Sequence, residues 1–474
     1  MDRKLFLIPF IIIFVLAGCT MAPQYSRPDA PVPSEWPNGP AYQETKTNPA
    51  VPAAVELPWR EFIIDERLRN VIEIALHNNR DLRLAALNVE RARAYYGIQR
   101  AELFPSVNGV GSMYKERTPA DLSSGGSAYT AERYDVNLGI ASWEIDFFGR
   151  IRGLKDKALE EYLATDQARR SAQIMVISST AQGYLALAAD REALQLVSKT
   201  LENQEATYDL IRKRCNAGIA SDLDLRRVQS QVDSARGDVA RYTQQVAQDE
   251  NALNLLAGSP VFKELLPTDL KSVIPPREIS AGLLSDVLLS RPDVMAAEHQ
   301  LKAANANIGA ARAAFFPRIA LTASAGTASA DLSGLFKSGS GTWMFSPQIV
   351  MPIFDARTWS AYEVTKIEKE ISIAEYEKAI QTAFREVADA LAERGTINQR
   401  VAAQQSLVDA NTEIYRLSEL RYMKGVDSYL SVLDAQRSLR IAQQVLIMLR
   451  FAQTSNLITL YKTLGGGENK QTDK

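Results

Sequence analysis

Few side chains of this sequence could carry out chemistry on a substrate. The chain has only two histidines and two cysteines, too few ligands for a typical zinc or iron–sulfur site. Residues 334–340 have the glycine spacing of a phosphate-binding loop, but Ser340 stands where that loop requires lysine. No pair of carboxylates stands out as a candidate for acid–base catalysis. The residue types therefore argue against an enzyme, a bound cofactor or a metal site.

Cys19 is the one residue whose surroundings predict a covalent modification. A short basic region precedes an apolar run, residues 5–18, which is shorter than the ~20 residues that a membrane-spanning helix needs. The run ends in Leu16-Ala17-Gly18-Cys19, which resembles the lipobox of bacterial lipoproteins. The resemblance implies a signal peptide at residues 1–18, a lipid on Cys19 and, because Thr20 follows instead of aspartate, an outer-membrane destination. The alternative is an ordinary signal peptide with a chance cysteine.

The composition describes a folded protein without nucleic-acid-binding character. Its 474 residues include 54 Lys and Arg against 56 Asp and Glu, whereas proteins that coat nucleic acid are strongly basic. Hydrophobic residues make up 46% of the chain, which excludes a disordered protein. A mean hydropathy of −0.16 excludes a bundle of many membrane-spanning helices but permits amphipathic membrane strands. With Cys19 acylated, Cys215 is left without a partner, so stability must come from packing and assembly.

The chain repeats itself. At an offset of 212, Asp81, Gly97, Phe104 and Pro105 match Asp293, Gly309, Phe316 and Pro317. At an offset of 206, Phe148 and Leu185 match Phe354 and Leu391, and at 207, Arg214 and Gly218 match Arg421 and Gly425. Such a nearly constant offset indicates a tandem duplication in which both halves have the same local structure.

The repeat and its proline-rich borders predict the domain organisation. After the signal peptide we expect a lipidated, extended arm at 19–65 and a first structural repeat at 66–257. A linker at 258–285 then leads to the second repeat at 286–464 and a flexible tail at 465–474. Each repeat is predicted to consist of a helix, two strands, a long helix, a turn and a further helix.

Alternating sequences predict four strands. Apolar residues alternate with small or polar ones over 134–141, 319–326 and 342–354, and more weakly over 105–115. Strands of ~10–14 residues can cross a bilayer when tilted. Four strands cannot close a barrel, because about eight are the usual minimum, and open edges in lipid leave backbone groups unsatisfied. A membrane-inserted chain must therefore share its barrel, and three copies with about 12 strands favour a pore.

After each strand pair the spacing of apolar residues becomes that of a coiled coil. Leu187, Leu194, Leu201 and Tyr208 fall seven residues apart. No proline interrupts residues 150–214, so a single helix of ~95 Å is expected there. Its charged surface requires water around it.

The duplication and three short motifs resemble one known family. The motifs are Trp143–Arg150, Met351–Phe354 and Gly425–Gln436. They resemble the TolC-like outer-membrane efflux factor family, and most of all its lipoprotein branch of the OprM type, over nearly the whole mature chain. The resemblance implies an α+β membrane protein, a homotrimer whose β-barrel of about 12 strands, four per chain, continues into a periplasmic α-helical coiled-coil barrel. It also implies two protein partners, a periplasmic adaptor and an inner-membrane pump of the resistance–nodulation–division (RND) class.

The resemblance further implies a gate at the periplasmic tip. Gly218 and Gly425 follow the long helices, where glycine ends a helix by adopting positive φ. Leu430 and Asp434 match residues that form pore-narrowing rings in the family, and Arg437 lies on roughly the same helix face. The plainer alternatives are that Leu430 packs in a coiled-coil core and that Asp434 forms a surface ion pair with Arg437.

A lock is implied for the same tip. By position, Asp224 after the first turn and Tyr422 before the second correspond to the family's locking residues, and a carboxylate can accept a strong hydrogen bond from a tyrosine hydroxyl. Ser431 stands where the TolC branch has a second aspartate. The acidic ring is therefore expected to be single.

The predicted function is that of a passive exit duct. It would carry drugs and small amphipathic solutes through the outer membrane, whose lipid surrounds its strands, while its helices stand in the periplasm. A duct for type I protein secretion is the alternative of the same class. A coiled-coil structural lipoprotein without a pore is the alternative of another class. The lipobox and the OprM-like motifs favour efflux.

Overall fold

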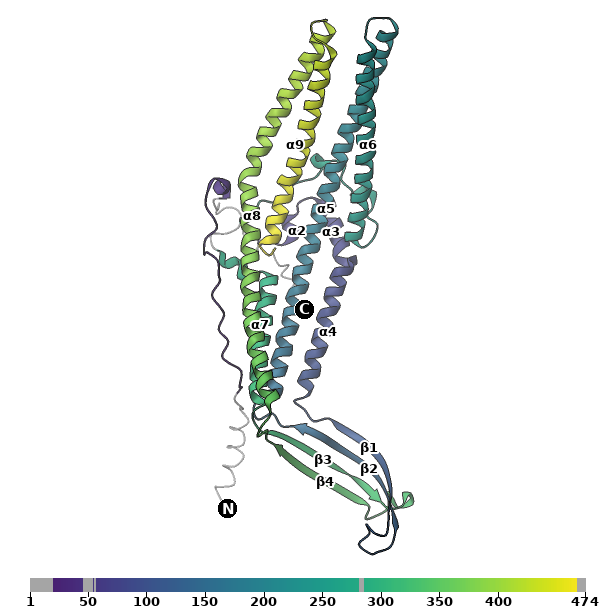
Figure 1. Ribbon diagram of the computed structural model, residues 1–474, viewed down its shortest axis with the longest axis vertical. Helices are drawn as coiled ribbons and strands as arrows, with labels where there is room; N and C mark the ends of the chain where they lie inside the picture. Colours follow the sequence, from purple (N-terminus) through teal and green to yellow (C-terminus); the bar gives the residue numbers. More distant parts are fainter. Residues whose placement is uncertain (1–19, 46–53, 55–56, 281–284, 467–474) are drawn as a thin grey trace. The chain divides into compact units, whose positions relative to one another are not determined.

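The computed structural model describes residues 20–45, 54, 57–280 and 285–466. Cys19 and the predicted signal peptide lie outside the described residues. The predicted order of elements is confirmed in both halves (Figure 1). The first half contains α3 (Glu66–Asn78), α4 (Arg80–Ala101), β1 (Val107–Thr118), β2 (Tyr129–Glu144), α5 (Arg150–Asn216) and α6 (Asp222–Ala257). The second contains α7 (Pro292–Ala313), β3 (Arg318–Ser329), β4 (Gly341–Val350), α8 (Ala356–Met423) and α9 (Tyr429–Thr463).

Short elements occupy the borders of the two halves. They are η1 (Pro40–Thr45), α2 (Trp59–Phe62), η3 (Lys263–Leu265), η4 (Leu270–Ser272), η5 (Ser285–Ser290) and, between β3 and β4, η6 (Leu332–Gly334). Over its described part, residues 258–280, the predicted linker contains the short 3₁₀ turns η3 and η4. No described helix has the length and apolar character that would let it span a membrane.

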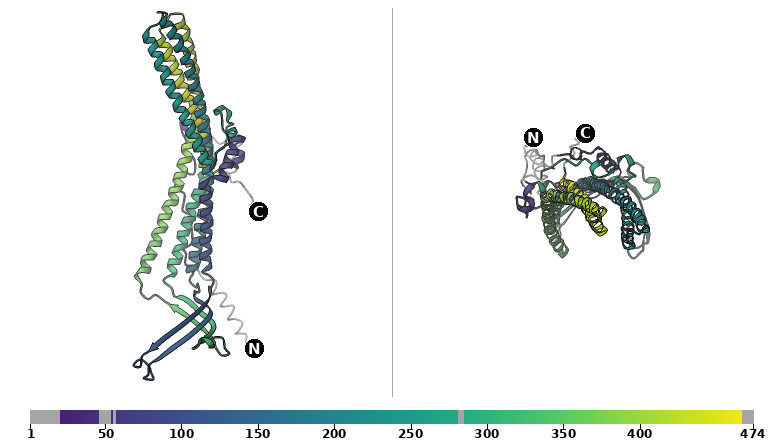
Figure 2. Two further views of the ribbon diagram at one scale, coloured as in Figure 1. Left: turned by 90° about the vertical axis from the view of Figure 1, so that its right-hand side faces the viewer. Right: turned by 90° about the horizontal axis from the view of Figure 1, so that it is seen from above.

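The four strands form one antiparallel sheet in the order β1-β2-β3-β4. Leu138 of β2 lies opposite Gly109 of β1 and Ala325 of β3, and the ladder shifts register between Ile140 and Trp143. Figure 2 shows the twist between the β1–β2 and β3–β4 hairpins. Both β1 and β4 are edge strands of this sheet, so each has a row of backbone groups with no partner strand among the described residues.

The strand predicted over 342–354 is too long. In the structure β4 ends at Val350, although the apolar alternation continues past it. Pro352 lacks a backbone N–H for the ladder, and the chain turns there toward α8. The weakly alternating first strand is conversely longer than predicted, reaching Thr118.

The chain divides into two compact units that cut across the repeats. One, here called the strand unit, comprises residues 1–29, 88–166 and 296–376, and so contains the whole sheet. The other, the turn unit, comprises residues 30–87, 167–295 and 377–474. Each unit takes parts from both halves of the duplication.

In the turn unit the two helix pairs α5–α6 and α8–α9 run side by side up to their turns (Figure 1). The predicted uninterrupted helices are confirmed, since α5 has 67 residues and α8 has 68. Near the turns, Ile211 of α5 and Val228 of α6 pack with Tyr429, Val432 and Leu433 of α9 in one buried cluster. This shared core joins the two helix pairs.

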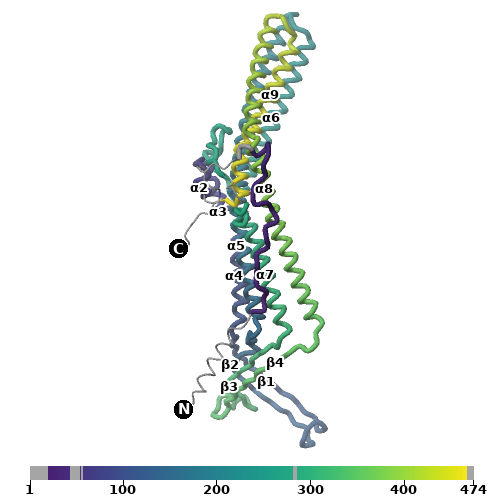
Figure 3. Tube along the Cα trace, turned by 90° about the vertical axis from the view of Figure 1, so that its left-hand side faces the viewer, coloured from purple at the N-terminus to yellow at the C-terminus, as the bar shows by residue number. Residues whose placement is uncertain are grey.

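In the strand unit, residues 20–29 form an extended segment, here called the strap, which follows α7 (Figure 3). Arg27 makes a two-pronged ion pair with the buried carboxylate of Glu298, at 3.1 and 2.7 Å. The side-chain amide of Asn305 donates to the carbonyl of Pro23 at 2.8 Å. A Cβ at Gly309 would lie 2.6 Å from the backbone nitrogen of Ala22, so the strap can sit this close only because residue 309 is glycine.

Candidate functional site

Both long helices end in the same hydrogen-bonded turn. At the end of α5, the amide of Gly218 donates to the carbonyl three residues earlier at 2.9 Å, and the next amide donates to the carbonyl of Arg214 at 2.8 Å. At the end of α8, Gly425 and the residue after it make the same two bonds at 2.9 and 3.0 Å, the second to Arg421. This is the Schellman motif, which requires a left-handed residue, and the two glycines have φ of 74° and 73°.

The charged side chains at the two turns differ. In the second turn Arg421 holds the carboxylate of Asp427 with two bonds, at 2.6 and 3.0 Å, which lowers the pKa of that carboxyl. The repeat counterpart of Asp427 is Ala220, so the first turn offers Arg214 no equivalent carboxylate. Arg214 instead donates to the hydroxyl of Tyr422 at 3.3 Å, and its guanidinium lies 5.5 Å from the ring centroid. It thereby links the first turn to the second.

Tyr422 belongs to an aromatic cluster at the second turn. Its ring packs edge-to-face on Tyr429, with ring centroids 5.0 Å apart. Tyr429 is buried, which raises the pKa of its phenol. Tyr422 is half-buried, so its hydroxyl has a fixed position at the edge of the shared core.

Asp224 lies in the first turn of α6 and is held by its own helix. Its amide donates to the hydroxyl oxygen of Ser221 at 3.1 Å, and that hydroxyl donates to the Asp224 carboxylate at 2.7 Å. The guanidinium of Arg227 lies 3.8 Å away. Asp224 and Tyr422, the predicted lock, thus each have a different partner in the single chain.

Leu430, Asp434 and Arg437 line one hollow between α6 and α9, with a volume of about 350 Å³. Arg437 and Asp434 form an ion pair at 3.2 Å, and both side chains are largely exposed. Leu430 is 43% exposed, whereas Leu433, one turn along, is 8% exposed. Within the chain it is therefore Leu433, and not Leu430, that fills the coiled-coil core.

The hollow has more positive charge than the sequence suggested. Arg226 and Arg227 of α6 face it together with Arg437, against the single carboxylate of Asp434. A ring of Asp434 side chains would therefore be flanked by guanidinium groups. The described residues contain no group of three or more side chains suited to hold a metal ion.

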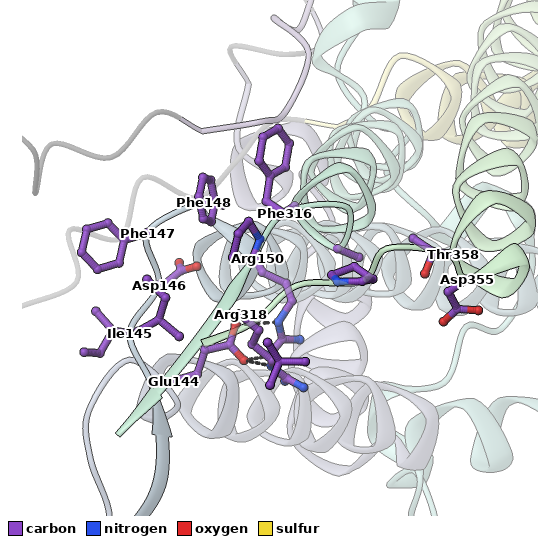
Figure 4. Close-up of a pocket in the computed structure, with 16 residues that line it drawn as sticks. Glu144, Ile145, Asp146, Phe147, Phe148, Arg150, Phe316, Arg318, Asp355 and Thr358 are labelled. Carbon is purple, nitrogen blue, oxygen red and sulfur yellow. Dashed lines mark hydrogen bonds and ion pairs between the residues drawn. The ribbon is translucent and has the colours of Figure 1, made fainter. Parts of the chain in front are cut away.

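A second site, which sequence reasoning missed, lies where the strands meet the helices in the strand unit. A pocket with a volume of about 290 Å³ lies there, and Figure 4 shows the residues that line it. Glu144, at the end of β2, bonds Arg150 twice at 2.9 Å and also pairs with Arg318 at the start of β3.

Beside that ion cluster, Phe148 stacks on Phe316 with ring centroids 4.8 Å apart and planes 22° from parallel (Figure 4). Phe148 and Arg150 both lie in a motif that the sequence singled out, but no single residue there indicates its partner. The signal that could have found the stack is the repeat, because both phenylalanines have phenylalanine counterparts, Phe354 and Phe104.

Comparisons with known proteins agree with this geometry. The family model described as outer membrane efflux protein matches residues 71–259 and 283–466, one stretch in each repeat. The toluene efflux pump outer membrane protein TtgC and the antibiotic efflux pump outer membrane protein ArpC, both from Pseudomonas putida, are each 47% identical over 466 residues. Those alignments cover 98% of this chain and 95% of each relative.

Solved structures give the same result. The crystal structure of the open state of the Neisseria gonorrhoeae MtrE outer membrane channel is 37% identical, with a TM-score of 0.85, and the match covers 95% of this chain and 98% of that one. The predicted fold class, that of a trimeric TolC-like channel, and the predicted outer-membrane localisation are confirmed. The chain therefore belongs to the outer membrane efflux protein family.

Proposed function

We propose that three copies of this chain form the passive exit duct of a tripartite efflux system. The observation that carries the proposal is a match to the efflux family in both repeats, combined with a four-stranded sheet whose edges β1 and β4 are free. Because unpaired edges are costly in lipid, the sheet must close with the sheets of other copies. The periplasmic adaptor and the inner-membrane RND-type pump are the proposed protein partners.

The proposed cargo is drugs and other small amphipathic solutes. Similar chains from Pseudomonas putida are named for the efflux of toluene and of antibiotics. A duct needs no catalytic group, and the described residues hold the tip together with ion pairs and capping bonds. Deleting the gene should lower the tolerance of cells to toluene and to hydrophobic antibiotics. Unchanged tolerance with lost protein export would favour the secretion alternative.

The proposed gate is the second turn and the helix that follows it. Three copies of Leu430 and Asp434 would ring the duct, with Arg437 beside them. The exposure of Leu430 supports a pore-facing position, because the core position nearby is filled by Leu433. A lock between Asp224 and Tyr422 would be compatible with both present partners. The Tyr422 hydroxyl accepts from Arg214 and keeps its own hydrogen to donate, and the Asp224 carboxylate can accept that bond beside the one from Ser221.

Planar-bilayer conductance tests both the duct and the gate. The purified wild type is compared with the double variant Asp224→Ala with Asp434→Ala, and small channels that widen in the variant are expected. The matched control is Asp233→Ala with Asp409→Ala, which removes one exposed carboxylate from α6 and one from α8 and leaves the hollow and the gate residues in place. Channels equally wide in wild type and variant would retain the duct and reject the gate assignment.

A lipid on Cys19 is part of the same proposal. Cys19→Ser should abolish the incorporation of labelled palmitate. Trimers should still form, because an acyl chain contributes only ~0.8 kcal/mol per buried CH₂ and the shared sheet holds the copies together. Cys215→Ser is the control and should keep its label. Palmitate retained by Cys19→Ser would reject the assignment of the lipid to this residue.

A further inference from the structure

The two faces of the sheet differ in polarity. Leu138 of β2 pairs with Ala325 of β3, which in turn pairs with Trp343 of β4, so these side chains share one face. The neighbouring row, on the opposite face, consists of Asn137, Gly326 and Thr342. In a barrel that crosses a membrane, the apolar face contacts lipid and the polar face lines the interior. Trp343 therefore points toward lipid.

The loop after β3 folds over this lipid-facing side. Ser329, the last residue of β3, is four residues from Ala325 and so lies on the same face. A Cβ placed on Gly334 would lie 2.4 Å from the hydroxyl oxygen of Ser329, so the turn η6 packs against that side chain. Thr327, also on this face, has its hydroxyl oxygen shielded from solvent. The loop thus lies on the outside of the sheet and does not extend over the interior.

This segment, residues 330–340 and here called the β3–β4 loop, has a defined shape. Its backbone makes two successive three-residue bonds, from the amide of Gly334 to Asp331 at 2.9 Å and from the amide of Lys337 to Gly334 at 3.1 Å. The side chain of Leu335 is 5% exposed. A loop with its own bonds and a buried anchor holds its remaining side chains in fixed positions.

The side chains that the β3–β4 loop exposes are apolar and cationic. Leu332 is 66% exposed and Phe336 is 77% exposed, close in sequence to Trp343, which is 78% exposed. Lys337 is exposed, and the described residues give its ammonium group no ion-pair partner. Asp331, the one carboxylate of the loop, comes six residues before that lysine. Such a combination suits a membrane interface, where a lysine stem lies along apolar groups and its charge reaches the polar region.

The loop of the other hairpin lacks this combination. Residues 119–128, between β1 and β2, contain neither a basic nor an aromatic residue, and Leu122 is their one large apolar side chain. The duplication has therefore given only the second hairpin the groups that suit a lipid with an anionic headgroup.

We infer that the β3–β4 loop binds lipopolysaccharide, the phosphorylated glycolipid of the outer leaflet. Leu332 and Phe336 pack among its acyl chains, and the ammonium group of Lys337 pairs with a phosphate. The leaflet follows from the chain order, because β3 begins just after α7 and ends at this loop, on the side away from the periplasmic helices. The site continues the lipid-facing surface that includes Trp343. The inference requires the strands to lie in the outer membrane and goes beyond the proposed efflux role.

The bound lipid would have a consequence for the exit of the duct. A β3–β4 loop held in the leaflet by its apolar side chains cannot swing over the interior of the barrel. The contact therefore keeps the outer mouth open on the side of the second hairpin in every copy.

Photo-cross-linking in whole cells tests the site on the assembled, full-length protein. Phe336→benzoylphenylalanine is irradiated, the trimers are purified and denatured, and the adduct is identified by mass spectrometry. A monomer that carries lipopolysaccharide is expected. The matched control is Met344→benzoylphenylalanine, because Met344 is 49% exposed on the interior face, next to Trp343, and should give no lipid adduct.

Three results would overturn the inference. One is the lack of a lipid adduct at position 336 in assembled trimers. Another is an adduct with phospholipid alone, which would assign the loop to a different lipid. The third is cross-linked dimers, which would show that a second copy covers the loop.

Binding by purified trimers separates the acyl contact from the phosphate contact. Trimers in detergent, freed of lipopolysaccharide, are titrated with bisphosphorylated lipid A and with its dephosphorylated form. Leu332→Ser with Phe336→Ser should weaken the binding of both forms about tenfold, because both lose apolar contact. Lys337→Gln should weaken only the phosphorylated form, severalfold.

Leu122→Ser is the control for this titration, since it removes an exposed leucine from the other hairpin loop and should leave both affinities unchanged. Equal affinities in the wild type and in both loop variants would reject the site even if an adduct forms. Neither measurement depends on transport. Lost drug tolerance with intact lipid binding would therefore count against the proposed function only.

Discussion

The two turns of the molecule share a backbone and differ in their side chains. Each has the same Schellman bonds and a glycine with φ near 74°. The second turn neutralises its arginine with Asp427, whereas the first leaves Arg214 to reach across to Tyr422. After the duplication both copies therefore kept the glycine and the backbone hydrogen bonds that end the helix, while the charged side chains around that turn diverged. The link at the tip takes one group from each turn, and the hollow takes side chains from both of the helices that follow the turns.

Removing the link between the turns should have the largest effect. Arg214→Ala loses the hydrogen bond to Tyr422 and the contact with its ring, together about 1.5 kcal/mol, so the gate equilibrium should shift about tenfold toward open. Arg421→Ala, the counterpart variant, breaks only a bond inside its own turn and should shift it less. Open probability in planar bilayers is the measurement. Equal shifts would mean that the two arginines are equivalent after all.

Tyr422→Phe isolates one part of that link. The variant keeps the ring packing on Tyr429 and the contact with Arg214 but loses the hydroxyl that accepts the bond. A loss of ~1 kcal/mol predicts a severalfold rise in open probability, smaller than that of Arg214→Ala. Conductance traces recorded under the same conditions decide this. Behaviour identical to the wild type would remove the hydroxyl from the gate.

Because the two turns have the same backbone conformation, replacing either glycine by alanine should destabilise its turn by the same amount. Gly218→Ala and Gly425→Ala should each destabilise the local turn by ~1 kcal/mol, because alanine is strained at positive φ although no atom lies within 4 Å of the new Cβ. Hydrogen exchange at the turn amides measures it. Gly237→Ala, at an open position inside α6, is the control and should slow exchange slightly. Unequal costs at the two turns would show that their side chains alter the backbone requirement.

The smallest effect expected is a pH dependence confined to the first half. Burial, followed by the neighbouring carboxyl of Asp249, raises the pKa of Asp190 to about 7. The counterparts of these two residues are neutral, Thr396 and Asn456. Since the folded chain binds this proton and the unfolded chain releases it near the ordinary value of 3.8, stability should fall as pH rises toward 7 and stay low above it.

Thermal unfolding at pH 6 and pH 8 measures this dependence. The wild type should unfold at a higher temperature at pH 6. Asp249→Asn, which copies the second half, should reduce the difference. If the unfolding temperatures at pH 6 and pH 8 differ by the same amount in Asp249→Asn as in the wild type, the pH dependence arises elsewhere in the chain.

Local signals in the sequence were enough to predict the helices and strands of this fold. Glycine at 218 and 425 marks helix ends, and the lack of proline over 150–214 marks a single helix, because each depends on residues close in the chain. The strand predicted over 342–354 was wrong at its end, since Ile353 continues the alternation beyond the break at Pro352. Alternation reports which side chains could share a face and does not report where the ladder stops.

Contacts between distant residues were beyond such reasoning. Arg214 and Tyr422 are 208 residues apart, and nothing near either one indicates that the first turn packs on the second. The three-way ion cluster of Glu144, Arg150 and Arg318 likewise joins two halves of the chain. The gate residues were predicted from a family resemblance. The positive charge around Asp434 could be recognised only once the structure placed α6, with its two arginines, beside α9.

The strap attaches the first described residues to α7, and this attachment limits the distance between the end of α7 and the outer membrane. The carbonyl of Met21 accepts a bond from Arg312 near the end of α7, and the absence of a side chain at Gly309 lets the next residue, Ala22, lie against that helix. With the proposed lipid on Cys19, the span from that residue to Met21 is two residues, about 7 Å of extended chain. A tether this short leaves little slack. The end of α7 would then stand at one fixed depth beneath the outer membrane, whatever the opposite turns are doing.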